Sequence, residues 1–386
     1  MSALQWGIIS TGNIAKAFAK GVAGSKHSKL VAVGSRSQAS ADKFGEEFDV
    51  PHRHASYEAL LADDEVQAVY IATPHPLHPQ WAIQAAEAGK HILCEKPVGL
   101  NQWQAQAMIE AARRAGVFFM EAFMYRCHPQ TAKLVELIGN GAIGEVRLVQ
   151  ASFSFHGPDN PEHRLMNNAL GGGGILDVSC YPVSLARLVA GAAQGKPFAN
   201  PVNVKGAGHL GPTNVDEYAA AVLEFDSGII ATVATGVQLQ QDNVARIYGS
   251  DGWIEVPSPW LPGGRDAGAV AFQLHVRGKE GRTVTIESDT PLYGLEADVC
   301  AKAIAAGKVE ADGPPMSWDD TIGNMAALDR WRSEIGLVYE DEQPRPCTVD
   351  LASRPVRSRV EDAGHKMRYG QVPGLDKPVS RLIFGA

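Results

Sequence analysis

Two segments of the chain carry side chains that could move a proton. Lys96 precedes Pro97 at the end of an apolar run and is held extended, so its amine could donate to a substrate oxygen and lower a neighbouring hydroxyl's pKa. Asp177 and Tyr181 would share one helix face if a helix began near residue 176, although Pro182 favours a later start or a kink. A phenol titrates at about pH 10, so Tyr181 would need a cationic Lys96 close by to stabilise its phenolate. Each residue alone is also compatible with an ordinary structural or surface role.

The turn after the first apolar run resembles the phosphate-binding turn of a dinucleotide fold. The pattern GxGxxG/A is present with Ser10 in place of the first glycine, so we expect the backbone to turn there without a free φ. Gly12 would let a pyrophosphate approach the helix N-terminus. An ordinary strand-to-helix turn is the alternative. The predicted cofactor contacts in this turn are Ser10, Thr11, Gly12, Asn13 and Ile14.

The end of the second apolar run bears on which cofactor is used. An NAD-preferring fold keeps an acid there, about 20 residues after the turn, whereas this chain has Ser35 and Arg36. A hydroxyl and a guanidinium suit a 2′-phosphate, so we expect NADP(H), with a solvated surface arginine as the alternative. Later strand ends bring more polar groups to the ligand-binding edge. The further predicted cofactor contacts are Thr73, Pro74, His75, His78, Glu95 and Lys96.

The order of apolar runs predicts an α/β protein of two domains. Residues 1–125 alternate strand-length and helix-length segments, which indicates a doubly wound parallel Rossmann sheet. Residues 126–345 change to period-2 strands, which predicts an α+β domain with an open, mostly antiparallel sheet and helices near 180–189, 296–306 and 317–335. Residues 346–386 are charged and contain several Pro and Gly, and we interpret them as a linker or arm with a strand pair at its end.

Composition excludes several function classes. Lys and Arg number 35 against 43 Asp and Glu, a net charge of −8, so no basic face is evident for a nucleic acid. The five cysteines show neither disulfide nor Cys/His ligand spacing, so we expect no metal site and a reducing, cytoplasmic location. The start of the chain does not resemble a signal peptide, and no apolar stretch is long enough to span a membrane.

Five motifs in order resemble the glucose-fructose oxidoreductase/inositol dehydrogenase (Gfo/Idh/MocA) family, and most of all its dimeric dihydrodiol dehydrogenase branch. They are STGNIA, ATPHPLH, EKP, MEAFMYRCHPQ and GGGGILDVSCYPV, and the resemblance covers residues 3–345. It implies a Rossmann domain followed by an open sheet whose free face pairs subunits, hence a homo-oligomer. It also implies Lys96, Asp177 and Tyr181 as catalytic residues and Arg126 and His128 as cofactor-side or substrate-side residues.

Two further segments complete the predicted substrate site. His163 and Arg164 lie in a polar loop that could overhang the cleft, or that is simply solvated. Residues 171–174 are four glycines, which could form a lid hinge or, as we slightly favour, a tight approach to the following helix. The predicted substrate contacts are Lys96, His128, His163, Arg164, Asp177 and Tyr181.

Together these features predict an NADP(H)-dependent oxidoreductase that moves a hydride to or from a hydroxyl-bearing carbon of a sugar or polyol. Tyr181 would take the proton from the substrate hydroxyl, and Lys96 would stabilise the resulting state of Tyr181 by lowering the pKa of its phenol. The alternatives are a trans-dihydrodiol substrate, a non-catalytic NADP sensor, and a tightly held cofactor recycled between two sugars. The tail from residue 367 resembles the opening of an aldo/keto reductase, which suggests either a module of a natural fusion or a native arm.

Overall fold

The structure, a computed structural model, describes residues 3–343 and two short strands at 369–370 and 379–380 of the 386-residue chain. Residues 1–343 form one compact unit and residues 344–386 a second. Within the second unit, β15 (Tyr369–Gly370) pairs antiparallel with β16 (Val379–Ser380), where the sequence predicts a strand pair. The rest of the predicted linker or arm lies outside the described residues.

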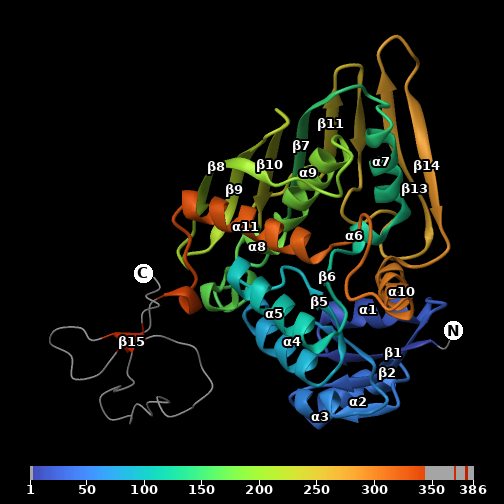
Figure 1. Ribbon diagram of the computed structural model, residues 1–386, viewed down its shortest axis with the longest axis vertical. Helices are drawn as coiled ribbons and strands as arrows, with labels where there is room; N and C mark the ends of the chain where they lie inside the picture. Colours follow the sequence, from blue (N-terminus) through green and yellow to red (C-terminus); the bar gives the residue numbers. More distant parts are fainter. Residues whose placement is uncertain (1–2, 344–368, 371–378, 381–386) are drawn as a thin grey trace. The chain divides into compact units, whose positions relative to one another are not determined.

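The N-terminal part of the first unit is a six-stranded parallel sheet in the order β3-β2-β1-β4-β5-β6 (Figure 1). Its strands read as continuous apolar runs because helices cover both faces of a doubly wound sheet. The order reverses between β1 and β4, and this switch point is where such sheets bind ligands. Its elements are β1 (Leu4–Ile9), α1 (Asn13–Ala23), β2 (Ser28–Gly34), α2 (Gln38–Glu47), β3 (His52–His54), α3 (Tyr57–Leu61), β4 (Ala68–Ile71), η1 (His75–Leu77), α4 (His78–Glu87), β5 (His91–Glu95), α5 (Gln102–Ala115) and β6 (Phe119–Ala122).

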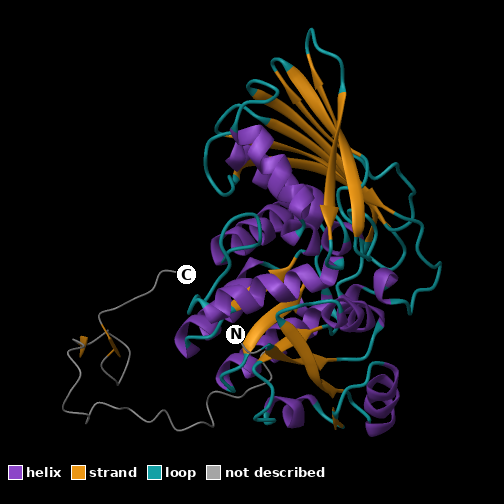
Figure 2. Cartoon of the chain, turned by 90° about the vertical axis from the view of Figure 1, so that its right-hand side faces the viewer, coloured by secondary structure: helices purple, strands orange, loops and turns teal. Residues whose placement is uncertain are grey.

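The C-terminal part is built on an eight-stranded sheet in the order β14-β13-β12-β11-β7-β10-β9-β8, in which β7 and β10 make the one parallel pair. Helices pack against one face and leave the other open (Figure 2). The elements are α6 (Met124–Cys127), α7 (Pro129–Gly139), β7 (Val146–Ser154), η2 (Arg164–Met166), η3 (Asn168–Leu170), α8 (Gly174–Asp177), α9 (Cys180–Ala192), β8 (Pro201–Leu210), β9 (Asp216–Phe225), β10 (Ile230–Gly236), β11 (Ala245–Gly249), β12 (Gly252–Val256), β13 (Gly268–Val276), β14 (Arg282–Ser288), α10 (Leu292–Ala305), α11 (Trp318–Glu334) and η4 (Glu340–Glu342).

Helices α10 and α11 tie the two sheets together. Helix α10 packs on α1, and α11 lies against both α5 of the first sheet and β8 of the second. The Phe119 N–H donates to Val309 O at 3.0 Å, and Trp318 Nε1 donates to Phe119 O at 3.1 Å. Residues from beyond the second sheet therefore help to build the Rossmann part.

The predicted fold class is confirmed, including the open, mostly antiparallel second sheet. The three predicted C-terminal helices are present as α9, α10 and α11. The sequence did not single out β3, α3, α7, β8, β12 or β14. Strands β8 and β14 are the edges of the large sheet and carry many exposed positions, so their apolar alternation is weak.

Within the described residues, no single helix is both long and apolar enough to cross a membrane. One bent pair, the 168–177 segment with α9, would pass on length and composition alone.

Candidate active site

The loops after β1, β4 and β5 meet at the carboxyl edge of the parallel sheet and hold most of the predicted cofactor residues. Ser10 has a φ of +99°, a region that favours glycine, so the expected turn is made by a residue without glycine's conformational freedom. Its N–H donates to Gly34 O at 3.0 Å, which joins the turn to the end of β2.

The first turn of α1 is free to accept an anion. Gly12 is the N-cap residue, no described side chain caps the helix, and its first turn contains no acid. A Cβ on Gly12 would meet only Ser10 Oγ, at 3.9 Å, so the space in front of the backbone is open. Gly12 and Asn13 are exposed and Thr11 and Ile14 are half-buried, so the turn is accessible from solvent. Unpaired helix N–H groups beside open space fit a pyrophosphate.

Residues at the ends of β2 and β4 also suit a bound dinucleotide. Ser35 is buried and its N–H donates to His54 O at 3.0 Å, while Arg36 is exposed. Tyr57, which sequence reasoning missed, is influenced by both Ser10 and Arg36: burial raises the pKa of its phenol, and the Arg36 charge and a Ser10 hydrogen bond oppose the rise. Thr73 Oγ1 is buried with no hydrogen-bond partner among the described residues. These donors suit a dinucleotide with a phosphate near Arg36.

The second sheet's helices bring Asp177 to Lys96. Lys96 follows β5 and makes a cis peptide with Pro97. Its Nζ donates to Asp177 O at 2.6 Å and lies 3.8 Å from Asp177 Oδ1. Arg164 Nη1 lies 2.8 Å from the same carboxylate oxygen. Burial opposes ionisation of Asp177, but Lys96, Arg164 and His75 together hold its pKa well below the ordinary value. The site therefore contains a buried carboxylate paired with two cations.

His75 completes this cluster from the loop after β4. Its Nε2 lies 4.0 Å from Asp177 Oδ1, and its Nδ1 lies 3.3 Å from Gly171 O. Burial lowers the pKa of His75 well below its usual value, so the imidazole is neutral at physiological pH. We call Lys96, His75, Arg164 and Asp177 the charge cluster.

Tyr181 lies beside the charge cluster in an apolar cage. The helix predicted from residue 176 is broken: α8 ends at Asp177 and α9 begins at Cys180, which leaves Pro182 in a first turn. The Tyr181 hydroxyl contacts Met124 Sδ at 3.3 Å, and Lys96 Nζ lies 5.1 Å above the ring centroid. The surrounding rings are those of Phe123, Tyr125, Phe153 and Trp260.

This environment contradicts the expectation that Lys96 stabilises the phenolate of Tyr181. Burial, reinforced by neighbouring Tyr293 and Glu95, raises the pKa of Tyr181 well above its ordinary value. Lys96 approaches the face of the ring and donates its hydrogen bond to Asp177 instead of to the phenol oxygen. In this conformation the phenolate is not stabilised.

Two predicted ligand contacts instead hold the helices of the second sheet. Arg126 is 1% exposed, and its guanidinium pairs with Asp320 at 2.6 Å and donates to Ser184 Oγ at 2.7 Å. His128 is buried and caps α7 by accepting the Gln130 N–H at 3.0 Å. The structure gives both side chains protein partners, which supports a structural role, and their expected role in contacting a ligand stays a prediction.

Three further predicted residues position the loops of the site. His78 is fully buried, and its two ring nitrogens contact Thr73 O at 2.7 Å and Pro97 O at 2.9 Å, which joins the loops after β4 and β5. Glu95 is buried, accepts a hydrogen bond from the Tyr70 hydroxyl, and accepts the Lys96 N–H at 3.2 Å. His163 contacts the Leu165 N–H at 3.4 Å at the start of η2. Pro74 directly precedes η1, which carries His75.

The four glycines form a close backbone approach, as we favoured. Asp216 Oδ2 accepts the Ile175 N–H at 2.7 Å, and Tyr339 donates to Gly172 O at 2.8 Å. A Cβ on Gly173, whose φ is +102°, would lie 2.1 Å from Asp216 Oδ1. Asp216 therefore caps the short helix that ends in Asp177. Sequence reasoning missed it because it lies 39 residues downstream of Asp177 on β9.

Comparison with known proteins identifies the family. The description "Oxidoreductase family, NAD-binding Rossmann fold" matches residues 4–123, and "GFO/IDH/MocA C-terminal domain" matches residues 131–255. The chain belongs to the GFO/IDH/MocA oxidoreductase family. The expected family resemblance is thereby confirmed.

Named relatives and solved structures span most of the chain. It is 33% identical to D-xylose 1-dehydrogenase (NADP(+)) 2 of Haloferax volcanii, over 84% of this chain and 95% of that protein. It is 30% identical to trans-1,2-dihydrobenzene-1,2-diol dehydrogenase of Mus musculus, over 88% and 99%. A 3-ketoreductase from Actinomadura kijaniata, solved with NADP and TDP-benzene, gives a TM-score of 0.74 at 25% identity over 86% and 98%.

The Asp216 cap predicts a specific pH dependence of stability. Burial raises the pKa of Asp216 from 3.8 to about 7, against the opposing hydrogen bonds from backbone N–H groups. A raised pKa means that the folded state binds the proton more tightly, so this group's contribution to stability is complete below about pH 4 and is lost as the pH rises through about 7. The loss should approach about 1.4 kcal/mol per pH unit between these limits.

The measurement is urea unfolding of the wild type and of Asp216→Asn between pH 4 and pH 7, with the exposed Asp226→Asn as control. We expect the stability of Asp216→Asn relative to wild type to rise with pH, whereas Asp226→Asn follows the wild type. Parallel curves for all three proteins would contradict the raised pKa of Asp216.

Proposed function

We propose that this chain is an NADP(H)-dependent oxidoreductase acting on a hydroxyl-bearing carbon of a sugar or related polyol. The observation that carries the proposal is the contact between Lys96 Nζ and Asp177, made beside an uncapped α1 at the carboxyl edge of a Rossmann sheet. The names of the relatives support it, since they include an NADP-dependent xylose dehydrogenase and dihydrodiol dehydrogenases. An aldose-aldose oxidoreductase from Caulobacter crescentus, at 25% identity and a TM-score of 0.76, has the same fold.

The Rossmann residues would bind the cofactor, and NADP(H) would supply the hydride acceptor or donor when bound. In this proposal the α1 N-terminus with Gly12 binds the pyrophosphate. Arg36 and Ser35 take the 2′-phosphate, because a guanidinium matches phosphate geometry. Tyr57 supports this corner through its proximity to Ser10 and Arg36.

We propose that Lys96 exchanges the proton with the substrate oxygen. In reduction the ammonium would donate a proton to that oxygen as a hydride reaches its carbon, and in oxidation the neutral amine would take the proton as the hydride leaves. Lys96 is the cation of the charge cluster that lies at the end of β5, close to both Asp177 and the Tyr181 ring. Asp177, an ionised carboxylate, would accept hydrogen bonds from substrate hydroxyls, and Arg164 would orient it. Tyr181 would act as a neutral phenol, because the apolar cage disfavours the phenolate.

A trans-dihydrodiol is the second candidate substrate. The observation that favours it is the similarity to several dihydrodiol dehydrogenases, which in the mouse case extends over 88% of this chain and 99% of that protein. A vicinal diol also presents the hydroxyl groups that Asp177 and Lys96 would bind. A substrate panel that includes both classes separates them.

Replacement of Lys96 tests the proposed role. Lys96→Met keeps the stem of the side chain but removes the charge, so we expect turnover to fall by about 100-fold or more while NADPH binding persists. The control is Lys133→Met, whose side chain lies on the surface of α7. Turnover should be followed by nicotinamide absorbance and NADPH binding by fluorescence titration.

Two results would count against this assignment. Full activity in Lys96→Met would remove Lys96 from the chemistry. NADPH binding without turnover of any polyol or diol by the wild type would favour the sensor interpretation instead.

Cofactor that co-purifies with the protein would support internal recycling between two sugars.

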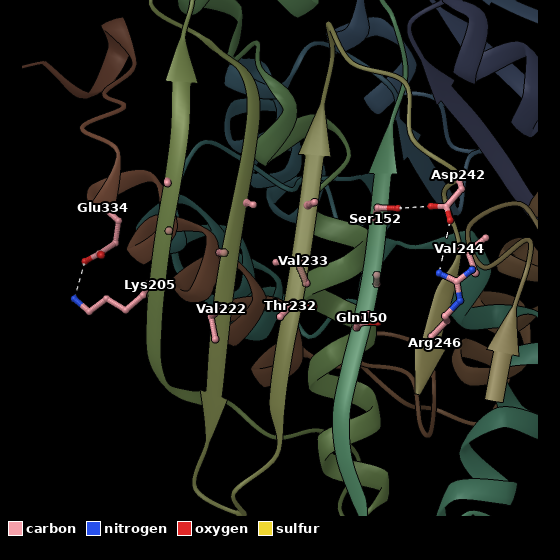
Figure 3. A pocket seen from close by; sticks show the side chains of 16 residues that line it. Gln150, Ser152, Lys205, Val222, Thr232, Val233, Asp242, Val244, Arg246 and Glu334 are labelled. Atoms are coloured by element: carbon pink, nitrogen blue, oxygen red, sulfur yellow. Dashed lines mark hydrogen bonds and ion pairs between the residues drawn. The ribbon is translucent and has the colours of Figure 1, made fainter. Parts of the chain in front are cut away.

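We also propose that the open sheet face forms a homo-oligomer interface. Small or apolar side chains, including Ala220, Val222 and Thr232, line a hollow of about 700 Å³ on this face (Figure 3). Ion pairs flank it, from Lys205 to Glu334 at 3.2 Å and from Arg246 to Asp242 at 3.7 Å. A self-complementary sheet face suits a twofold dimer.

Val222→Glu should disrupt that interface. Val222 is 39% exposed on β9, next to the edge strand β8 of this face, and a twofold dimer through the face would bury the added carboxylates in an apolar contact. Light scattering after size exclusion should show a dimer or tetramer for the wild type and for Val338→Glu, an exposed loop control, and a smaller species for Val222→Glu. A wild-type monomer would overturn the interface.

Two further proposals concern cellular context. We propose a cytoplasmic location, supported by the free thiols of Cys94, Cys127, Cys180 and Cys300 in the described residues. The resemblance of the tail to an aldo/keto reductase keeps a fused partner domain as a proposal, alongside a native arm.

A further inference from the structure

Three metal-ligating side chains converge away from the charge cluster, at the edge of the parallel sheet. His52 and His54 are two residues apart on β3, so their side chains leave the same face of the strand. Asp63 lies in the turn after α3. Its Oδ2 lies 2.7 Å from His52 Nδ1 and 2.9 Å from His54 Nε2. All three ligand atoms lie within 4.8 Å of one another.

We propose that His52, His54 and Asp63 bind one divalent transition-metal ion of the Zn²⁺ type. Two imidazoles and one carboxylate are a donor set that suits zinc, copper or nickel and not magnesium or calcium. Zinc ligands at about 2.0–2.2 Å in a tetrahedral site lie about 3.3 Å apart. Each imidazole nitrogen therefore needs to move about half an ångström further from Asp63 Oδ2, the two nitrogens already lie within 4.8 Å of each other, and a water molecule would complete the coordination.

The surrounding charges favour a cation. Asp63 Oδ1 accepts the Glu65 N–H at 2.9 Å, which leaves Oδ2 directed at the two imidazoles. Glu65 Oε2 lies 3.7 Å from His52 Nε2 and adds a second negative charge. Lys90 is the opposing cation, and its Nζ is held on the backbone oxygens of Asp63 and Val66 at 2.8 Å.

The side chains are accessible enough for an ion to enter. Side-chain exposure is 33% for His52 and 23% for His54, against 9% for Asp63. A metal would replace the two His–Asp hydrogen bonds and would require both imidazoles to be unprotonated, so binding should weaken in acid. Metal binding would therefore break the two His–Asp hydrogen bonds, which hold β3 to the turn after α3, and this loss would reduce the net binding free energy.

Metal binding at this site would also stabilise the position of the end of β2. The His54 carbonyl accepts the Ser35 N–H at 3.0 Å, and His54 pairs with Gly34 in the sheet register. Ser35 and Arg36 are the residues proposed above to hold the 2′-phosphate. This consequence rests on the proposed function, whereas metal binding itself does not.

Calorimetric titration of the metal-free full chain with ZnCl₂ tests the site. We expect one Zn²⁺ per chain in the wild type, and an affinity reduced by about tenfold or more in His54→Ala and in His52→Ala. The control is His209→Ala, because His209 is an exposed histidine paired with a single carboxylate, 3.8 Å from Glu217. Unchanged binding in both His variants, or no binding by the wild type, would overturn the proposal.

A spectroscopic measurement on the wild type removes dependence on variant folding. With one equivalent of Cu²⁺, electron paramagnetic resonance should show coupling to two imidazole nitrogens. A spectrum without nitrogen coupling would also overturn the proposal. Neither readout uses turnover, so failure of the metal site and failure of the proposed oxidoreductase function remain distinguishable.

Discussion

The burial of the Asp177 carboxylate is the constraint on which the site depends. A buried charge is costly unless it is paired and hydrogen-bonded, and here Lys96 and Arg164 supply the pairing. Lys96 comes from the parallel sheet, whereas Asp177 and Arg164 come from the segment between β7 and β8. The electrostatic requirement thus joins the two halves of the chain at the place where the switch point opens. Removing either cation would leave the buried carboxylate with a single charged partner.

Backbone packing places that carboxylate. The glycine turn allows Asp216 to approach the N-terminus of α8, and Tyr339 holds the same turn by its Gly172 carbonyl. His78 performs the equivalent task on the other side by joining the loops that carry Thr73 and Lys96. The groups proposed for chemistry are therefore supported by buried residues that hydrogen-bond to the backbone of the site's loops, while Asp216 Oδ1 has no hydrogen-bond partner among the described residues.

Much of the fold and part of the site follow from sequence. Buried parallel strands give uninterrupted apolar runs, so the Rossmann sheet and its loops were predictable, and so was the convergence of Lys96 with Asp177. The environment of Tyr181 was not, because four rings from distant segments close around it. Motif position suggested a ligand role for Arg126 and His128, but their partners, Asp320 and a helix N-terminus, are visible only in three dimensions. The His52–His54–Asp63 group was not predicted, because Asp63 lies outside β3 and meets the two histidines only through the turn after α3.

Reduction of the nicotinamide by the purified wild-type chain tests the central claim most directly. The absorbance of NADP⁺ and NAD⁺ reactions should be followed with a panel of aldoses, inositols and a trans-dihydrodiol. The charge cluster and the Ser35–Arg36 corner predict rapid reduction of NADP⁺, and much slower reduction of NAD⁺, by one class of substrate. Absence of reduction across the whole panel, or a clear preference for NAD⁺, would contradict the proposed function.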